Sequence, residues 1–580
     1  MLKTASCQSW THFGHVAIVF SVGLVSAGFA QPVPDAGGIL RQIDPAAPTP
    51  PAKPPPSLLL PRETRPALPA GSDVTVEVLG FHITSSTAFT EAQLLPLVQD
   101  AIGSALNIQE LDSVADRITR FYRNRGYLVA RAYLPAQEVK SGIVEIAVLE
   151  GFYSAINVQN QSLLESKHFA RYLVPLQQSR AIEQRMLERS LLLLGDATGV
   201  GAITPTLSQG DQVGGSELFV DLGEAPQFSG SLEVDNYGGE SNGRNRLGFV
   251  ANVNSPTGRG DQFTLRGIVT PPGFQPSEGP HGRTVFGRVS YATPLGYRGL
   301  RGGFAYADLR YRIGEPFQAL DASGDGKITS LYLSYPFIRS RGFNLYGQLA
   351  YDGKRLVDSS LVNTALFGHA DVEKRINAVT AALTGDSRDG LLHGAINRYA
   401  VAVTVGDLKI QTAAARADDE KGLATHGDFS KVYLNFERLQ RISETWSVSF
   451  SATVQESNTN LDAAEKFPLS GPNGVRAYVQ GYLSGDCGYV ASLELRKTFE
   501  KAPWLQLLAF IDHGGVRSDR DPLPASDDNN RTLSGAGIGF MAALPNNFAV
   551  RFNHAWRFDP DEPAKREAVH QTWVQAVKYF

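Results

Sequence analysis

Cysteine and methionine are scarce in this chain of 580 residues, which contains two cysteines and three methionines. Cys7 lies within the first thirty residues, so Cys487 has no partner in the remainder of the chain. A disulfide framework and a cysteine metal cluster are therefore excluded. The formal net charge is only −4, and so mild a balance gives no indication of a nucleic-acid partner.

Long apolar runs are missing after the first thirty residues, although hydrophobic residues make up 42% of the chain. The mean hydropathy is −0.15, and a spanning helix needs about 20 consecutive apolar residues, so a helical membrane protein is not expected. Residues 16–30 are apolar and end in small residues, which predicts a secretory signal peptide over residues 1–30. A short N-terminal anchor is the alternative. The shortness of the run and the Pro-rich sequence after it disfavour that alternative.

Motifs of the common catalytic sites are also missing. The sequence contains no nucleophile-elbow serine, no His-Glu-x-x-His zinc helix and no glycine-rich phosphate loop with its lysine. Residues 321–328 mimic the start of a calcium-binding loop, but the twelfth position is Tyr332 instead of glutamate, so a hairpin turn is the better interpretation. We expect no catalytic residue, no metal and no cofactor, and the chain is not expected to be an enzyme.

Proline and glycine organise the N-terminal part of the chain. Residues 31–44 contain a possible short helix, which Gly37 and Gly38 weaken. Prolines then dominate residues 45–72, and a segment of this composition is extended and cannot build a packed core. We therefore expect a small helical element tethered by a linker.

Two α+β units of the same order are predicted to follow, at residues 73–151 and 152–226. In the first unit, one helix is amphipathic because apolar residues recur at i, i+3 and i+4 spacing. The elements expected in the first unit are a strand at 74–83, helices at 91–103 and 109–125, and strands at 128–134 and 143–149. The second unit repeats this order with a strand at 153–158, helices at 166–173 and 182–194, and strands at 202–207 and 216–222.

Alternation of apolar and polar residues replaces helical periodicity from residue 227 to residue 580. Phe228 and Leu232 would face one side of a strand, for example, and Ser229 and Glu233 the other. The polar faces carry charges near the middle of long segments, which a water-filled lumen explains best. The fold class predicted is a membrane β-barrel of about 16 antiparallel strands, preceded by the two α+β domains.

One loop and one strand of this barrel carry a candidate site. The Gly/Pro-rich residues 471–478 read by composition as an ordinary external loop. Downstream, Phe510 and Asp512 share the lumen face of a strand. A carboxylate beside an inward-folded loop needs a cationic partner, and Arg476 is the candidate.

The residues of this loop and strand carry a family resemblance. Gly474-Val475-Arg476-Ala477-Tyr478, then Gly485-Asp486-Cys487-Gly488-Tyr489 and Phe510-Ile511-Asp512, resemble the two-partner secretion transporter family, the class of haemolysin activators and the filamentous-haemagglutinin exporter. The resemblance implies a signal peptide, a plug helix with its linker, two POTRA domains and the barrel, in that order. It also implies that the inward-loop motif of Val475, Arg476, Ala477 and Tyr478 meets a barrel-wall partner formed by Phe510 and Asp512. The glycine of the family motif is replaced by Ala477, so a glycine-only backbone angle is doubtful there.

The function implied by this resemblance is secretion of a partner exoprotein of haemolysin or adhesin type across the Gram-negative outer membrane, with the POTRA domains in the periplasm. The implied partners are an exoprotein with an N-terminal secretion domain, outer-membrane lipids, and the barrel-assembly machinery acting on the terminal Phe580; nucleic acid is not among them. We hypothesise that the client adds a strand beside one edge of the first POTRA domain. The residues expected at that edge are Leu128, Val129, Arg131 and Tyr133.

Three other functions stay open at this point. A barrel-assembly factor of the same superfamily is disfavoured by the Pro-rich linker and by the presence of only two modules. A passive porin or ligand receptor would share the barrel but would not need two α+β modules. A soluble carbohydrate-active β-protein is the most distant alternative.

Overall fold

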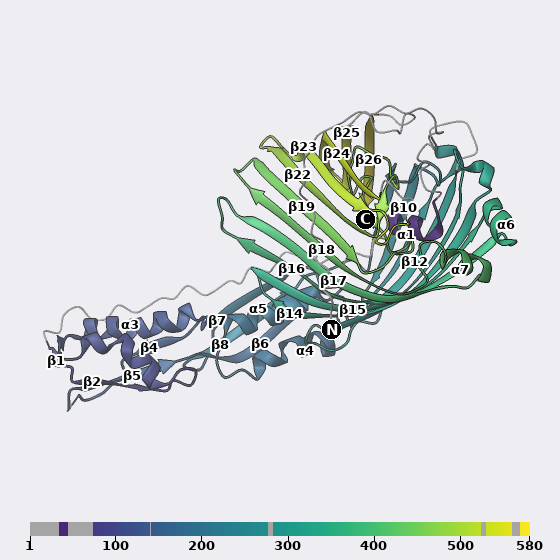
Figure 1. Ribbon diagram of the computed structural model, residues 1–580. Helices are drawn as coiled ribbons and strands as arrows, with labels where there is room; N and C mark the ends of the chain where they lie inside the picture. Colours follow the sequence, from purple (N-terminus) through teal and green to yellow (C-terminus); the bar gives the residue numbers. More distant parts are fainter. Residues whose placement is uncertain (1–33, 44–73, 140, 276–281, 524–528, 559–568) are drawn as a thin grey trace.

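The computed structural model describes residues 34–43, 74–139, 141–275, 282–523, 529–558 and 569–580. The predicted signal peptide and the Pro-rich linker lie outside these ranges. Two small α+β modules form an arm that joins one end of a large β-barrel (Figure 1). A short helix, α1 (Ala36–Ile43), lies inside the barrel.

The first module packs a three-stranded sheet of order β2-β5-β4 against helix α3. Strands β2 and β5 are parallel, whereas β4 and β5 are antiparallel. Helix α3 begins after Asn107, whose side chain accepts hydrogen bonds from the backbone N–H groups of Gln109 and Glu110. The elements are β1 (Val76–Glu77), β2 (Gly80–Thr84), α2 (Glu91–Leu94), η1 (Leu95–Leu97), η2 (Gln99–Ala101), β3 (Ala105–Leu106), α3 (Ile108–Asn124), β4 (Arg131–Tyr133) and β5 (Ile143–Leu149).

Three elements of this module differ from the sequence prediction. The strand expected at 74–83 is divided into β1 and β2, which belong to different sheets. The helix expected at 91–103 is divided into one α-helical turn and two 3₁₀ turns. Pro96 lies at the point of division, and proline cannot donate the backbone hydrogen bond that would continue an α-helix. The strand expected at 128–134 is shortened to the three residues of β4.

Glu150 at the end of β5 ties this module together. Its carboxylate accepts hydrogen bonds from the backbone N–H groups of Thr87 and Ala88, both 2.7 Å long, and from the hydroxyl of Tyr122 at 2.9 Å. Burial alone would raise the pKa of Glu150, but these hydrogen bonds stabilise the carboxylate and hold the pKa below its ordinary value. The carboxylate therefore fixes the loop before α2 against the sheet.

The second module repeats this topology with a sheet of order β6-β8-β7. Strands β6 and β8 are parallel, and β7 and β8 are antiparallel, as in the equivalent positions of the first module. The two modules meet where the backbone N–H of Gln184 donates to the carbonyl of Gly126 at 2.8 Å. The elements are β6 (Phe152–Asn160), α4 (Ser166–Gln177), α5 (Gln184–Asp196), β7 (Ile203–Gln209) and β8 (Gly215–Leu222).

In the described part of the chain, 16 antiparallel strands close into a barrel. The last strand, β26, pairs with the first, β9, through residues such as Gln575 and Asp235. The barrel strands are β9 (Phe228–Asp235), β10 (Arg246–Asn254), β11 (Gln262–Val269), β12 (Arg283–Pro294), β13 (Arg301–Arg312), β14 (Ser323–Arg339), β15 (Phe343–Ser359), β16 (Asp371–Asp389), β17 (Ala395–Ile410), β18 (Gly427–Arg441), β19 (Trp446–Ser457), β22 (Cys487–Phe499), β23 (Ala502–Arg517), β24 (Asn530–Leu544), β25 (Phe548–Arg557) and β26 (His570–Tyr579). The connections hold η3 (Pro272–Phe274), η4 (Gln318–Leu320), α6 (Leu361–Phe367) and α7 (Ala413–Asp419).

The alternation along each strand gives the barrel an apolar outer face. On β17, Val401, Val403 and Val405 are exposed, whereas Ala402 and Thr404 between them point inward and are buried. The predicted fold class is therefore confirmed. Residues 321–328, which mimic a calcium loop, close the β13–β14 connection and begin β14. Among the described helices, none has the length and apolarity needed to cross a bilayer.

The arm is fixed to the barrel by a buried ion pair. Arg339 at the end of β14 binds both carboxylate oxygens of Asp196 at the end of α5, each at 2.8 Å. Nearby, the backbone N–H of Glu165 donates to the carbonyl of Gly258 in the β10–β11 turn at 3.0 Å. The β10–β11 and β14–β15 turns thus mark the end of the barrel that faces the arm, and helices α6 and α7 lie at the other end (Figure 1).

Candidate functional site in the barrel lumen

The long connection between β19 and β22, residues 458–486, folds back into the barrel; we call it the inward loop. It contains a short β-pair, β20 (Phe467–Pro468) and β21 (Ser484–Gly485). Its tip is a tight turn, in which the N–H of Val475 donates to the carbonyl of Leu469 at 2.8 Å and the N–H of Tyr478 donates to that of Val475 at 3.2 Å. This turn presents Arg476 to the wall formed by β22 and β23.

Arg476 and Asp512 form a bidentate ion pair beneath the loop tip. Arg476 Nε lies 2.8 Å from Asp512 Oδ2, and Nη2 lies 2.7 Å from Oδ1. The backbone N–H of Arg476 also donates to Oδ2 at 3.1 Å. Only 3% of Arg476 and 1% of Asp512 is exposed. The structure thus brings together the two charged residues singled out in the sequence, in the geometry that best matches guanidinium to carboxylate.

Other groups complete the cage around this guanidinium. Arg476 Nη1 donates to Glu494 Oε1 at 2.6 Å, and Nη2 donates to Ser492 Oγ at 2.9 Å. The ring of Phe510 lies beneath it, with its centroid 3.4 Å from Cζ. Arg496 binds the second oxygen of Glu494 at 2.6 Å, so two carboxylates face two guanidinium groups. A buried charge needs partners of this kind, because its desolvation is otherwise uncompensated.

The backbone of the loop tip is held from the opposite side by the last two strands. Trp573 Nε1 on β26 donates to the carbonyl of Arg476 at 2.7 Å, and Arg557 Nε on β25 donates to that of Ala477 at 3.3 Å. Trp573 also makes an edge-to-face contact with Tyr237 near β9, with centroids 5.9 Å apart. The tip therefore binds the last strand of the barrel, and Trp573 of that strand contacts Tyr237 across the seam at which the barrel closes.

Ala477 replaces the glycine of the family motif without backbone strain. It is not among the described residues that have positive φ. Its methyl group is fully buried and faces Gly535 on β24, where a Cβ added to the glycine would lie only 2.4 Å from the Ala477 Cβ. The missing side chain at Gly535 provides the space that the extra methyl needs.

Helix α1 is bound to the barrel wall and to the inward loop. The N–H of Ala36 donates to Asp358 Oδ1 on β15 at 2.8 Å. Lys374 on β16 lies 3.8 Å from Asp35 and 2.8 Å from Asp462 of the loop. Gly37 packs so closely on the loop that a Cβ there would lie 2.6 Å from the backbone nitrogen of Ala464. One lysine and one close contact therefore join the helix, the loop and the wall.

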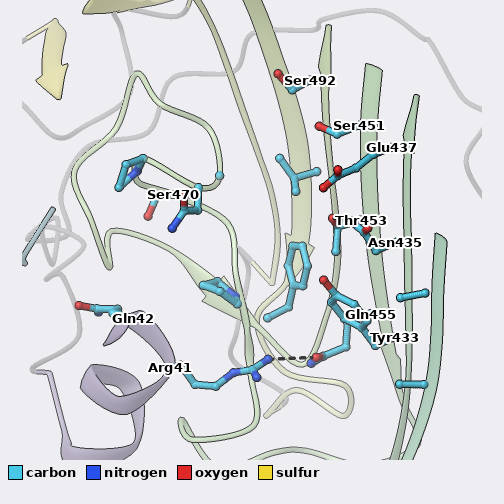
Figure 2. A pocket seen from close by; sticks show the side chains of 18 of the residues that line it. Arg41, Gln42, Tyr433, Asn435, Glu437, Ser451, Thr453, Gln455, Ser470 and Ser492 are labelled. Carbon is cyan, nitrogen blue, oxygen red and sulfur yellow. Dashed lines mark hydrogen bonds between the residues drawn. The ribbon is translucent and has the colours of Figure 1, made fainter. Parts of the chain in front are cut away.

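A second ion cluster closes the space next to the helix. Glu465 of the inward loop lies 2.5 Å from Lys354 on β15 and 2.6 Å from Lys431 on β18. Arg41 of α1 reaches the same region, donating from Nε to the carbonyl of Lys466 at 3.3 Å and from Nη2 to Gln455 at 3.5 Å (Figure 2). Helix and loop thus meet the wall together at this cluster.

The four residues expected to bind a client lie in two different places in the structure. Leu128 and Val129 precede β4 and pack against the core of the second module, so they are not part of a strand edge. Arg131 and Tyr133 do lie on β4, an edge strand of the first sheet. The N–H of Ala132 between them donates to Thr119 Oγ1 at 2.9 Å, so this outward-facing group is already bonded within the module.

Several residues of the site were missed in the sequence. Alternation places Ser492 and Glu494 on the polar, lumen-facing side of β22, but no sequence signal joins them to Arg476. No local signal marks Trp573, because its contact with Arg476 joins positions 97 residues apart in the chain.

Comparison with known proteins places this geometry in a family. The family model of the haemolysin secretion/activation protein ShlB/FhaC/HecB matches residues 214–542. The chain belongs to this family. A second family model, the ShlB-type POTRA domain, matches residues 76–151.

The curated relatives of this transporter cover most of its length. The heme/hemopexin transporter protein HuxB of Haemophilus influenzae (strain 86-028NP) is 26% identical over 84% of each chain. The outer membrane transporter CdiB of Escherichia coli O6:K15:H31 is 25% identical over 79% of this chain and 75% of its own. The solved structure of CdiB from Escherichia coli matches with a TM-score of 0.71 and 20% identity, covering 89% of this chain and 93% of that one.

Membership of this family gives the barrel its location and its role. The chain is an outer-membrane transporter that secretes a partner exoprotein by two-partner secretion, and its POTRA modules lie in the periplasm. The end of the barrel next to the arm is therefore the periplasmic end, and α6 and α7 lie at the extracellular end.

Proposed function

We propose that this transporter exports an exoprotein of haemolysin or adhesin type, which is recognised in the periplasm by its N-terminal secretion domain and passes outward through the lumen as an extended chain. The inward loop is the moving part, and the motif of Val475, Arg476, Ala477 and Tyr478 is its anchor on Phe510 and Asp512. The buried bidentate contact between Arg476 and Asp512, at 2.8 and 2.7 Å, carries this proposal. No step of this export is enzymatic.

The remaining segments have roles in the same proposal. The signal peptide at 1–30 directs export to the periplasm, and residues 31–44 plug the resting pore. The linker at 45–72 lets the plug leave, because a Pro-rich chain is extended and unpacked. Residues 73–151 and 152–226 are the two POTRA domains, and residues 227–580 are the barrel. The bonds of α1 to Asp358 and Lys374 support the plug role.

The test of the anchor is export by Arg476→Ala. Removing one partner of a buried ion pair leaves the other charge uncompensated, at a cost of about 3–5 kcal/mol. We expect secretion of the partner exoprotein to fall at least about tenfold, since about 1.4 kcal/mol is a factor of ten in an equilibrium. Secretion is measured as the amount of exoprotein in the culture medium by immunoblot.

Arg496→Ala is the matched control for this test. Arg496 binds the same Glu494 but is partly exposed and does not contact the loop tip. Its loss should leave most secretion intact, and heat-modifiable gel mobility should show that both barrels assemble. Normal secretion by Arg476→Ala would rule out the anchoring role.

Client capture is proposed at the β4 edge of the first module, where Arg131 and Tyr133 carry the contacts. Strand addition here requires the client to displace the hydrogen bond from the Ala132 N–H to Thr119, so the side chains of Arg131 and Tyr133 provide most of the surface. Leu128 and Val129 support the edge from the module junction. A pull-down with the purified secretion domain tests this surface. Arg131→Ala combined with Tyr133→Ala should weaken binding several-fold, whereas Thr206→Ala on β7, the equivalent strand of the second module, should not. Equal retention of the client by all variants would contradict the assignment.

Two further partners belong to the proposal. The apolar outer face of the barrel contacts outer-membrane lipids. The terminal Phe580 is the recognition element for the barrel-assembly machinery, while its backbone pairs with Gly230 through bonds of 2.9 and 3.1 Å. Phe580→Ala should lower the amount of folded barrel in the outer membrane without altering the protein once it is assembled.

A further inference from the structure

The lumen contains a cavity of about 700 Å³ beside the inward loop. Helix α1 packs on β13, β14 and β15, and the loop tip is held by β22, β23, β25 and β26. The cavity lies mainly along β17, β18 and β19 and extends to β22 beside the loop tip. Figure 2 shows side chains of β18 and β19, among them Asn435, Ser451 and Thr453, pointing into this space.

Charged residues line part of this cavity, and small neutral polar side chains form another part of its wall, which we call the polar lane. Hydroxyl groups both donate and accept hydrogen bonds, so they can serve the N–H and C=O groups of any peptide. Among the charged residues that line the cavity, Arg398 lies 3.5 Å from Glu437, and Arg496 lies 2.6 Å from Glu494. The lane residues are Thr404, Asn435, Ser449, Ser451 and Thr453, and Ser492 of the Arg476 cage lies beside them.

An ion cluster around Glu465 lies at the extracellular end of the lane. Lys354 and Lys431 lie toward the ends of β15 and β18 that are remote from the arm, and Glu465 of the loop binds both. Arg398 and Arg496 line the cavity near the periplasmic ends of β17 and β22. A chain that arrives from the POTRA modules therefore reaches the polar lane before it reaches the Glu465 cluster.

We propose that the polar lane is the binding site for the client chain during export, and that it takes an extended, uncharged polypeptide segment rich in small polar residues. The inference rests on the proposed export through the lumen and adds the path and the preferred chemistry. Hydroxyl and amide side chains hold the client backbone by hydrogen bonds that are exchanged as the chain advances. A client segment that carries many charges of one sign finds no side chain of opposite charge among the lane residues.

Cysteine labelling in the full-length protein tests the path. Ser451→Cys is introduced together with Cys487→Ser in detergent-solubilised protein. The probes are two six-residue peptides with a thiol-reactive pyridyl disulfide at one end, one made of Ser, Asn and Gly and one made of Lys and Gly. Binding in the lane raises the local concentration of the reactive group, so the neutral peptide should label Ser451→Cys about tenfold faster than the lysine peptide does.

Two control positions show whether fast labelling by the neutral peptide is specific to the polar lane. Ala452→Cys is the next residue on β19 and shares the outer face with Phe450. Thr264→Cys lies on the lumen face of β11, away from the lane, where Thr264 bonds Asn252. Labelling rates are normalised to those of a small methanethiosulfonate reagent. Equal labelling of Ser451→Cys and Thr264→Cys by the neutral peptide, or faster labelling of Ser451→Cys by the lysine peptide, would overturn the proposal.

A secretion assay separates this inference from the function on which it rests. Ser451→Trp fills the lane, whereas Ala452→Trp places the same side chain on the lipid face. We expect the first variant to lose at least about tenfold of its secretion and the second to secrete normally. Normal secretion by Ser451→Trp would refute the lane and leave export intact. Failure of the unaltered protein to secrete any exoprotein of haemolysin or adhesin type would refute the proposed function itself.

Discussion

Side-chain volume at single positions controls how the loop tip fits into the barrel. The Ala477 methyl fills the space left by Gly535, so the two positions must be considered together. Gly535→Ala would overpack this contact and is expected to destabilise the docked loop by about 1–3 kcal/mol. Faster cleavage of the inward loop by added protease in the assembled barrel would measure this.

Two further variants show whether the Ala477 contact is the cause. Ala477→Gly in the Gly535→Ala background should restore protection only in part, because the new Cβ would still lie 2.8 Å from the carbonyl oxygen of Trp556. Gly287→Ala adds the same methyl where nothing lies within 4 Å and should leave cleavage unchanged. No recovery in the double variant would show that Trp556, and not Ala477, limits the fit.

Residues of the site differ in how far the sequence could predict them. The face shared by Phe510 and Asp512 follows from strand alternation, and Arg476 was singled out by the need of a carboxylate for a cation and by the family motif. Trp573 could not be predicted, because its indole N–H meets the loop only after the last strand has closed the barrel. Burial of both charges likewise depends on the folded loop.

At the scale of elements, the glycines of α1 weaken the helix but permit its docking. Gly37 faces the backbone of Ala464, whereas a methyl on Gly38 would approach only the side-chain oxygen of Asp35, at 3.2 Å. Gly37→Ala should therefore displace the helix, with an overpacking cost of about 1–3 kcal/mol. In planar bilayers we expect a higher mean conductance for this variant than for the unaltered protein.

Gly38→Ala is the matched control for the helix. Both substitutions raise intrinsic helix propensity by about 1 kcal/mol, so the comparison isolates the contact with the loop. The conductance of Gly38→Ala should stay at or below that of the unaltered protein. The same increase in both variants would argue against a specific contact at Gly37.

Elements with strong periodicity were the ones that the sequence predicted best. Helix α3 has an apolar stripe and an Asn107 cap, and its observed bounds lie within one residue of those expected. The prediction of one helix at 91–103 was wrong. It was based on the spacing of apolar residues, which carries no information about the missing backbone N–H of Pro96. Strand β4 is shorter than expected because Leu128 and Val129 pack on the second module instead.

At the scale of the whole molecule, the arm and the barrel are coupled through Asp196 and Arg339. Asp196→Ala would leave Arg339, which is 7% exposed, without its carboxylate. We expect the junction to weaken by about 3–5 kcal/mol and hydrogen exchange in α5 to become faster. Replacing both residues by apolar ones, as in Asp196→Leu with Arg339→Met, should recover most of the protection.

Glu188→Ala provides the comparison for this junction. Glu188 lies 3.4 Å from Arg341, whose side chain is 39% exposed, and an ion pair that solvent reaches contributes about 0–1 kcal/mol. Its removal should change hydrogen exchange little. Similar exchange in Asp196→Ala and Glu188→Ala would mean that the buried pair does not couple the two parts.

The sequence by itself determined the order of the segments and which face of each strand is apolar, because periodicity and composition are local properties of the chain. It also contained the charged residues of the loop and the wall. Tertiary structure alone decided that Glu494 and Trp573 hold Arg476 and that a cavity remains along β17–β19. These features depend on contacts between distant strands, whose geometry exists only once the barrel has closed.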